Sequence, residues 1–173
     1  PQGAPVVPPE GLRRGLNALL PWDVRVVAAS EAPRAWHARF DALGKRYVYR
    51  LRRGDHLLPF EGLRETLASP RLDVRAMRAA AGRLEGRNDF GAFGLAGAPR
   101  KTTVRTLVRL DVGEAGSLLV VTAVGDGFLR GMLRRLVGTL LEAGLGRIDP
   151  LESLRRPGPT APAKSTGSKK PSP

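Results

Sequence analysis

The segment from Lys45 to Arg52, KRYVYRLR, has an alternation that strongly restricts its conformation. In an extended strand, successive side chains point to opposite faces. One face then carries two tyrosines and the other three arginines, the two sets being Lys45, Tyr47, Tyr49, Leu51 and Arg46, Val48, Arg50, Arg52. Aromatic rings flanked by cations suit the stacked bases and the phosphates of a nucleic acid. The pattern equally fits a half-buried strand with core tyrosines and solvated bases, so the strand alone leaves both interpretations open.

The charge of the whole chain favours a nucleic-acid partner. The sequence holds 29 Lys and Arg against 16 Asp and Glu, which gives a net charge of +13 and a pI near 11.4. A chain this basic is typical of proteins that bind polyanions. Most of the cations are arginines, whose planar guanidinium forms bidentate contacts with phosphate and stacks on bases. We therefore expect RNA or DNA, and not a membrane, as the partner.

Several other classes of protein are excluded by composition. The chain has no cysteine and two histidines, His37 and His56, so it offers no disulfide framework, thiolate nucleophile or cysteine zinc site, and too few histidines for a metal cluster. It also lacks the apolar run of about 18 residues that a membrane span requires. The amino end, PQGAPVVPPEG, has no charged segment followed by an apolar core. We expect an unexported cytoplasmic protein without a metal site.

Composition also predicts how the chain is divided. Residues 1–11 are expected to be irregular, residues 12–155 to form one domain, and residues 156–173 to be a disordered tail. The tail contains five prolines and four Lys or Arg, with no acidic or aromatic residue, so it cannot bury enough apolar area to become ordered. It contributes +4 of the +13, which means that the folded part is itself basic.

Hydrophobic periodicity predicts the secondary structure within the domain. Helices are expected over Gly11–Leu20, over residues 74–86 and over Phe128–Ala143, while strands are expected over Val24–Ala29, Lys45–Arg52, Thr102–Val112 and Ser117–Val124. The middle helix is expected to have Asp73 as its N-cap, Gly86 as its stop and an inward face of Val74, Met77, Ala81 and Leu84. The last two strands flank GEAG and form a hairpin. This order predicts an α+β fold with a largely antiparallel mixed sheet and helices packed on one side.

Three groups of motifs occur together in a fixed order. HARF precedes Lys-x-Tyr-x-Tyr, GRNDFGAF precedes VRTL, and GDGFLRGMLRRLVGTLLEAGLGR opens the last helix. In this combination the chain closely resembles the tRNA pseudouridine synthase A family, from about Leu12 to Ala163. The resemblance implies the pseudouridine synthase fold, here partial, and an enzyme that isomerises uridine to pseudouridine in the anticodon stem and loop of tRNA. It also implies a homodimer that needs no cofactor.

The resemblance further implies that the catalytic nucleophile is an aspartate in an Arg-Thr-Asp motif, which lies near the amino end of the family's sequences. No such motif occurs in this chain, which begins with proline. We therefore expect the chain to lack the amino-terminal catalytic loop and to be incomplete for catalysis, while still binding tRNA in a salt-dependent manner. GRND at Gly86–Asp89 looks similar, but it matches the family's separate Asp-Phe-x-x-Phe segment, where the aspartate hydrogen-bonds locally.

The resemblance assigns candidate roles to single residues. Tyr47 matches the active-site tyrosine that lies against the target base, and Arg134 matches the arginine that pairs with the catalytic aspartate. Phe128 is expected to close the apolar wall of the base pocket. Arg39 of HARF, Lys45 and Arg46 are candidate phosphate contacts, whereas Tyr49 is expected in the core and His37 is as readily structural.

An alternative remains open, namely a basic α+β module that binds RNA without catalysis. The chain lacks the RNP1-type pattern of one common class of such modules, which makes the synthase the preferred hypothesis.

The carboxyl end of the chain differs from the family pattern. After GPTAPA, Lys164 leads into STGSKKPSP, where the resemblance implies a final strand rich in glycine and leucine.

Overall fold

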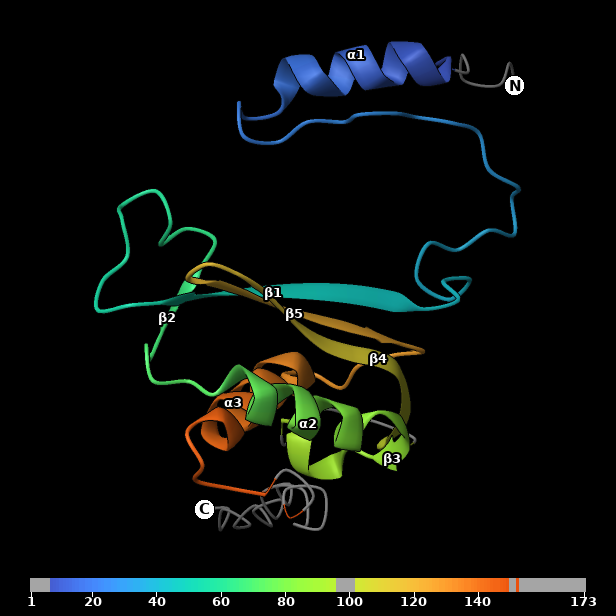
Figure 1. Ribbon diagram of the computed structural model, residues 1–173. Helices are drawn as coiled ribbons and strands as arrows, with labels where there is room; N and C mark the ends of the chain where they lie inside the picture. The colour runs from blue at the N-terminus through green and yellow to red at the C-terminus, as the bar shows by residue number, and fades with distance from the viewer. Residues whose placement is uncertain (1–6, 96–101, 150–151, 153–173) are drawn as a thin grey trace, which may run out of the picture. The chain divides into compact units, whose positions relative to one another are not determined.

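The structure is a computed structural model that describes residues 7–95, 102–149 and 152 (Figure 1). It consists of two compact units, Pro1–Ala42 and Leu43–Pro173, which are considered separately below. The tail expected at residues 156–173 lies outside the described residues.

The first unit contains one helix, α1 (Pro9–Leu19), among its described residues. It begins two residues before the expected Gly11, because a proline fits the first turn of a helix, where its missing N–H costs no hydrogen bond. An ion pair between Glu10 and Arg13 spans that turn, with a closest distance of 2.6 Å. The helix ends one residue before the expected Leu20, which is extended.

The strand expected at Val24–Ala29 is wrong, since these residues have no regular secondary structure. The segment VRVVAA is rich in valine, which favours strands, but a strand also needs a partner strand to receive its backbone hydrogen bonds. Here the side-chain amide of Asn17 takes the place of a partner strand for one residue, Val26. Its Nδ2 donates to the Val26 carbonyl at 2.9 Å, and its Oδ1 accepts from the Val26 N–H at 2.8 Å.

The second unit is built on a five-stranded sheet with the order β2-β1-β5-β4-β3. The strands are β1 (Lys45–Arg53), β2 (Thr66–Ala68), β3 (Gly86–Asp89), β4 (Val104–Ala115) and β5 (Leu118–Gly125). Only the β1–β2 pair is parallel, so the expected largely antiparallel mixed sheet is confirmed. Strands β2 and β3 were not expected, because segments of three and four residues are too short to show an alternating pattern.

The hairpin of β4 and β5 is confirmed, with a tighter turn than expected. Three residues of GEAG extend β4, and Ala115 pairs with Leu118 across the turn. Gly116 has a φ of 58°, a backbone conformation that a side chain disfavours.

Helix α2 (Val74–Leu84) begins directly after its N-cap Asp73, as expected, but it ends two residues before the expected Gly86, because Glu85 is already extended. The Asp73 carboxylate accepts hydrogen bonds from the backbone N–H groups of Arg75 and Ala76, at 2.8 and 3.2 Å. The positions expected to face inward are all buried, and Ala80 joins them: Val74, Met77, Ala81 and Leu84.

Helix α3 (Met132–Gly144) begins four residues later than the expected Phe128. Helical periodicity continued back to Phe128, but Gly131 has a φ of 77°, which interrupts a right-handed helix. The apolar residues that recur at helical spacing from Phe128 to Leu141 otherwise face the core, with Met132, Leu136, Val137 and Leu140 buried. Both α2 and α3 pack on one side of the sheet (Figure 1), so the expected α+β architecture is confirmed.

Strand β1 crosses the boundary between this core and the surface. Its partners on β5 are Ala123 for Tyr47, Val121 for Tyr49 and Leu119 for Leu51. Leu51 is buried and Tyr49 partly buried, whereas Tyr47 and Lys45 are exposed. The face that packs on the helices at one end of the strand is therefore open at the other end, next to the start of α3.

Candidate functional site

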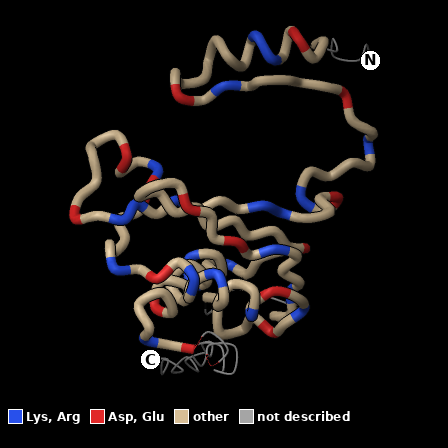
Figure 2. The backbone as a smooth tube through the Cα atoms, in the orientation of Figure 1, with Lys and Arg blue, Asp and Glu red and all other residues tan. Residues whose placement is uncertain are grey.

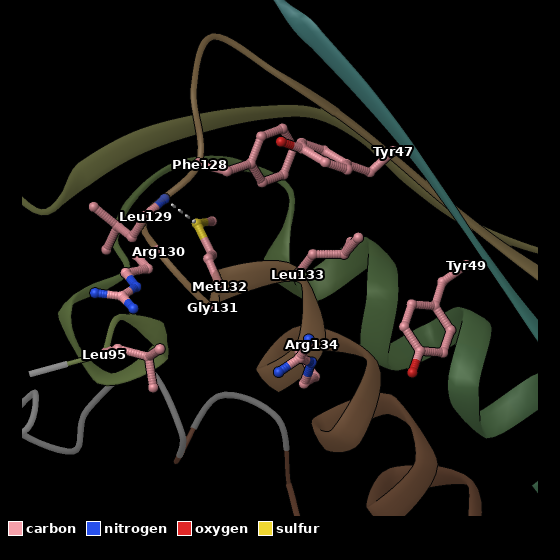
Figure 3. A pocket seen from close by; sticks show the side chains of 10 residues that line it. All are labelled: Tyr47, Tyr49, Leu95, Phe128, Leu129, Arg130, Gly131, Met132, Leu133 and Arg134. Atoms are coloured by element: carbon pink, nitrogen blue, oxygen red, sulfur yellow. Dashed lines mark hydrogen bonds between the residues drawn. The ribbon is translucent and has the colours of Figure 1, made fainter. Parts of the chain in front are cut away.

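An open pocket of about 490 Å³ lies where β1 faces the beginning of α3 (Figure 3). That volume falls in the range of small-molecule sites, about 300 to 1,000 Å³. Three parts of the chain line it, namely Tyr47 and Tyr49 from β1, Leu95 from the segment after β3, and residues 128–134. None of these residues carries a carboxylate.

Two aromatic rings form one wall of the pocket. Tyr47 and Phe128 meet edge to face, with ring centroids 4.9 Å apart and planes at 80°. Such a pair contributes roughly 0.5–1.5 kcal/mol beyond the area it buries. Tyr47 remains 43% exposed, so part of its ring is free to contact a ligand. The resemblance assigned both residues, 81 positions apart, to the base pocket, whereas the contact between their rings was not predicted from either segment.

Tyr49 has a mixed environment. It packs against the core, as expected, and its hydroxyl accepts a hydrogen bond from Thr66 Oγ1 at 3.1 Å. It also lines the pocket beside Tyr47 (Figure 3). Because the hydroxyl is tied to β2, the ring serves as a fixed wall.

Arg130 and Arg134 provide positive charge at the pocket. Both are exposed, and neither forms a hydrogen bond through its side chain or an ion pair with any residue that the structure describes. Arg134 lies in the first turn of α3, where a cation is unfavourable beside the positive end of the helix dipole. An anion that entered the pocket would be attracted both to these guanidinium groups and to the positive end of this helix dipole.

At the far end of β1 the arginines are paired with carboxylates. The Arg52 guanidinium lies 2.8 Å from Glu65 and 3.1 Å from Glu61, and Arg53 pairs with Glu114. The hydrogen bond to Glu65 raises the pKa of Arg52. Basic and acidic residues are interspersed along the unit (Figure 2), but the basic residues at the pocket lack these acidic neighbours.

The segment after β3 supports the pocket from the other side. Asp89 Oδ1 accepts a hydrogen bond from the Gly91 N–H at 2.9 Å, which is the local role expected for it. Phe90 and Phe93 are buried, with centroids 5.8 Å apart. Arg135 Nη1 donates to the Ala92 carbonyl at 2.8 Å, and the Leu95 N–H donates to the Arg130 carbonyl at 2.9 Å. These bonds join the segment to the beginning of α3.

The remaining candidate residues lie at the start of β1 and in the first unit. Lys45 and Arg46 begin β1 and are exposed. Arg39 and His37 belong to the first unit, where His37 Nδ1 accepts from the Arg39 and Phe40 N–H groups at 3.2 and 3.3 Å. Their proximity to the site stays a prediction.

The described residues contain no group of His, Cys, Asp or Glu that could hold a metal ion. In the same part of the chain, no helix is long and apolar enough to cross a membrane.

Comparison with known proteins agrees with the motifs. Residues 80–156 match the family model described as tRNA pseudouridine synthase. The chain is 41% identical over 162 residues to tRNA pseudouridine synthase A of Solibacter usitatus, covering 91% of this chain and 68% of that protein. It is 40% identical over 144 residues to the Geobacter sulfurreducens protein of the same name, covering 83% and 59%.

The chain belongs to the tRNA pseudouridine synthase A family. It spans 59%, 56% and 57% of the length of three of the relatives that it matches. The match to the family model includes α3 and its preceding loop, and thus Phe128 and Arg134.

Within this family member, sequence reasoning missed the part of the site made by Arg130 and Leu95. Helical periodicity places Arg130 on the polar side of the expected helix, four residues before Arg134, and by itself gives it no role in a site. The available signal was Gly131, which follows it in GFLRGM, because a glycine at that point can form a turn that separates Arg130 from the helix.

Proposed function

We propose that this chain acts in the isomerisation of uridine to pseudouridine in tRNA, with the pocket receiving the uracil base. The observation that supports the proposal most directly is the meeting of Tyr47, Phe128 and Arg134 at one pocket, from segments far apart in the sequence. The curated relatives are named for this reaction.

The reaction breaks the bond between ribose C1′ and uracil N1 and forms a bond between C1′ and C5. The C5 proton is lost and N1 gains one, so substrate and product are isomers and no oxidant is needed. The base must leave its stack and rotate while it is held. In our proposal Tyr47 stacks on the base and Phe128 holds the Tyr47 ring in place, which offsets part of the cost of unstacking.

Arg134 is proposed to pair with the carboxylate nucleophile of the reaction. A guanidinium beside a carboxylate keeps it ionised and fixes its direction. No residue that lines the pocket supplies that carboxylate, so the proposal assigns Arg134 a partner from outside the lining set. Arg39, Lys45 and Arg46 are proposed to contact phosphates of the tRNA. The whole protein is proposed to be cytoplasmic and to form a homodimer, and light scattering tests the dimer directly.

The same lack of a carboxylate favours a second candidate, an RNA-binding module without turnover. Two measurements separate the candidates, namely affinity for tRNA by fluorescence anisotropy and release of tritium from tRNA labelled at uridine C5. Tritium release supports the isomerase. Because the chain contains no Arg-Thr-Asp motif, binding without release is expected of both candidates for the chain alone. Binding without release that persists after an Arg-Thr-Asp segment from a relative is joined to the chain supports the module, and absence of binding at low salt contradicts both.

Variants of Tyr47 test the role of the pocket in either case. Tyr47→Leu removes the ring and is expected to weaken tRNA binding by about 1–3 kcal/mol, the usual contribution of one stacked base. Tyr47→Phe keeps the ring and should bind like the parent, while any tritium release should fall. Val48→Leu, on the opposite face of β1, is the matched control. Equal affinity in all four proteins would remove Tyr47 from the binding site.

A further inference from the structure

Three arginines at the start of α3 differ in what their side chains already contact. Arg135 is committed to the protein, since its Nη1 donates to the Ala92 carbonyl at 2.8 Å. Arg130 and Arg134 are exposed, line the pocket and have no side-chain partner among the described residues. The proposed function uses Arg134 and leaves Arg130 without a role.

The backbone that carries Arg130 is held firmly. Its carbonyl accepts from the Leu95 N–H at 2.9 Å, and Leu129, which precedes it, is buried. Gly131, which follows it, packs so closely on Leu95 that a Cβ there would lie 2.7 Å from Leu95 Cγ. Arg130 therefore combines a fixed main chain with an exposed guanidinium, so binding a ligand would require no ordering of the backbone.

The chemistry of Arg130 suits a phosphate. Its guanidinium is planar and permanently charged, and can donate two parallel hydrogen bonds to two oxygens of one anion. A nucleotide whose base enters an open pocket brings the two backbone phosphates on either side of it to the pocket rim. No carboxylate of the lining set competes for the guanidinium there.

We propose that Arg130 binds a backbone phosphate adjacent to the nucleotide whose base occupies the pocket, and so sets the position at which the RNA strand enters. The proposal rests on the proposed function, because it needs RNA at the pocket. In this proposal Arg130 contacts the backbone of the RNA strand, whereas Arg134 pairs with the carboxylate that reacts with the nucleotide.

A double-mutant cycle between protein and RNA tests the contact directly. The RNA is an anticodon stem–loop with a single loop uridine, in which the phosphates on either side of that uridine are replaced one at a time by neutral methylphosphonates. The proteins are the parent chain and Arg130→Ala, and the measurement is affinity by fluorescence anisotropy. With natural RNA, Arg130→Ala should weaken binding roughly tenfold and lower the salt slope by about one.

The proposal expects that loss to disappear with one of the two methylphosphonates, because the charge that Arg130 would contact is already gone. Arg130→Lys should restore the salt slope while recovering only part of the affinity, since lysine keeps the charge but not the fork. Arg75→Ala is the matched control, an exposed arginine of α2 outside the pocket. It should lose affinity equally with all three RNAs.

Additive losses for Arg130→Ala with both modified RNAs would overturn the proposal, as would coupling that appears for Arg134→Ala in its place. Both results leave the proposed function standing when Tyr47→Leu still weakens binding. Failure of the parent chain to bind natural RNA would overturn the phosphate contact together with the proposed function.

Discussion

Helices α1 and α3 have similar amphipathic sequences and opposite environments. In α1 none of the residues is buried, and leucines such as Leu12 and Leu19 face solvent. In α3 six residues are buried, because the sheet and α2 cover its apolar stripe. A helical pattern of apolar residues thus specifies a helix in both regions, but it becomes a core only where another apolar surface covers it.

The two units are also stabilised differently. The described residues of the first unit are joined by local hydrogen bonds, such as those of Asn17 with Val26 and of His37 with Asp41. The second unit joins residues far apart in sequence, as in the 20-residue separation of Thr106 and Asp126 or the 25-residue separation of Leu110 and Glu85. Cooperative unfolding is therefore expected of the second unit.

The largest expected difference comes from truncating one leucine in each helix. Leu136→Ala in α3 removes a fully buried side chain and should lower the free energy of unfolding by about 2–5 kcal/mol. Leu12→Ala in α1, where the side chain is 48% exposed, should change it by less than about 0.5 kcal/mol. Urea unfolding followed by circular dichroism gives both values.

Tryptophan fluorescence can report on the first unit separately in the same unfolding experiment. Both tryptophans, Trp22 and Trp36, lie in the first unit, and both tyrosines lie in the second. Trp22 is 87% exposed, so tryptophan emission should change little across the transition seen by circular dichroism. Equal effects of the two alanine variants, or a large cooperative change in tryptophan emission, would contradict the contrast between the units.

A pair of glycines should respond in opposite directions. Gly131→Ala forces a side chain into a φ of 77° and against Leu95, which should cost at least about 1–2 kcal/mol and narrow the pocket. Gly15→Ala lies inside α1 with nothing within 4 Å of the new Cβ, and should raise helix stability by about 0.5–1 kcal/mol. Thermal unfolding and helix content by circular dichroism measure the two changes, and an unchanged or raised stability of Gly131→Ala would show that Gly131 is not required at its turn.

The smallest expected effect is a dependence of α1 on pH. The hydrogen bond from Arg13 lowers the pKa of Glu10 below its ordinary value of 4.5. The pair therefore stabilises α1 above that value, and the stabilisation is lost as the pH falls through the lower pKa of the folded state. Helix content should decline slightly more between about pH 6 and about pH 3 in the parent chain than in Glu10→Gln. Identical profiles would show that the ion pair contributes nothing to α1.

The sequence predicted those elements whose pattern is long and regular. The alternation in Lys45–Arg52, the cap at Asp73 and the apolar stripe of α3 each reflect a local rule, and each was confirmed. The strand at Val24–Ala29 followed the same kind of rule and was wrong, because β propensity does not supply a partner strand. The short strands β2 and β3 exist only through pairing with β1 and β4, and no local signal marks them.

The sequence by itself determined the family, the basic character and the helices and strands that carry the motifs, since these depend on residue identity and spacing along one segment. Only the tertiary structure decided which side chains meet. It placed Tyr47 against Phe128, joined Arg135 to a backbone carbonyl and left the Arg130 guanidinium at the pocket without a partner among the described residues. The physical reason is that pairing register and the position where a helix begins depend on contacts between distant segments, which no single segment encodes.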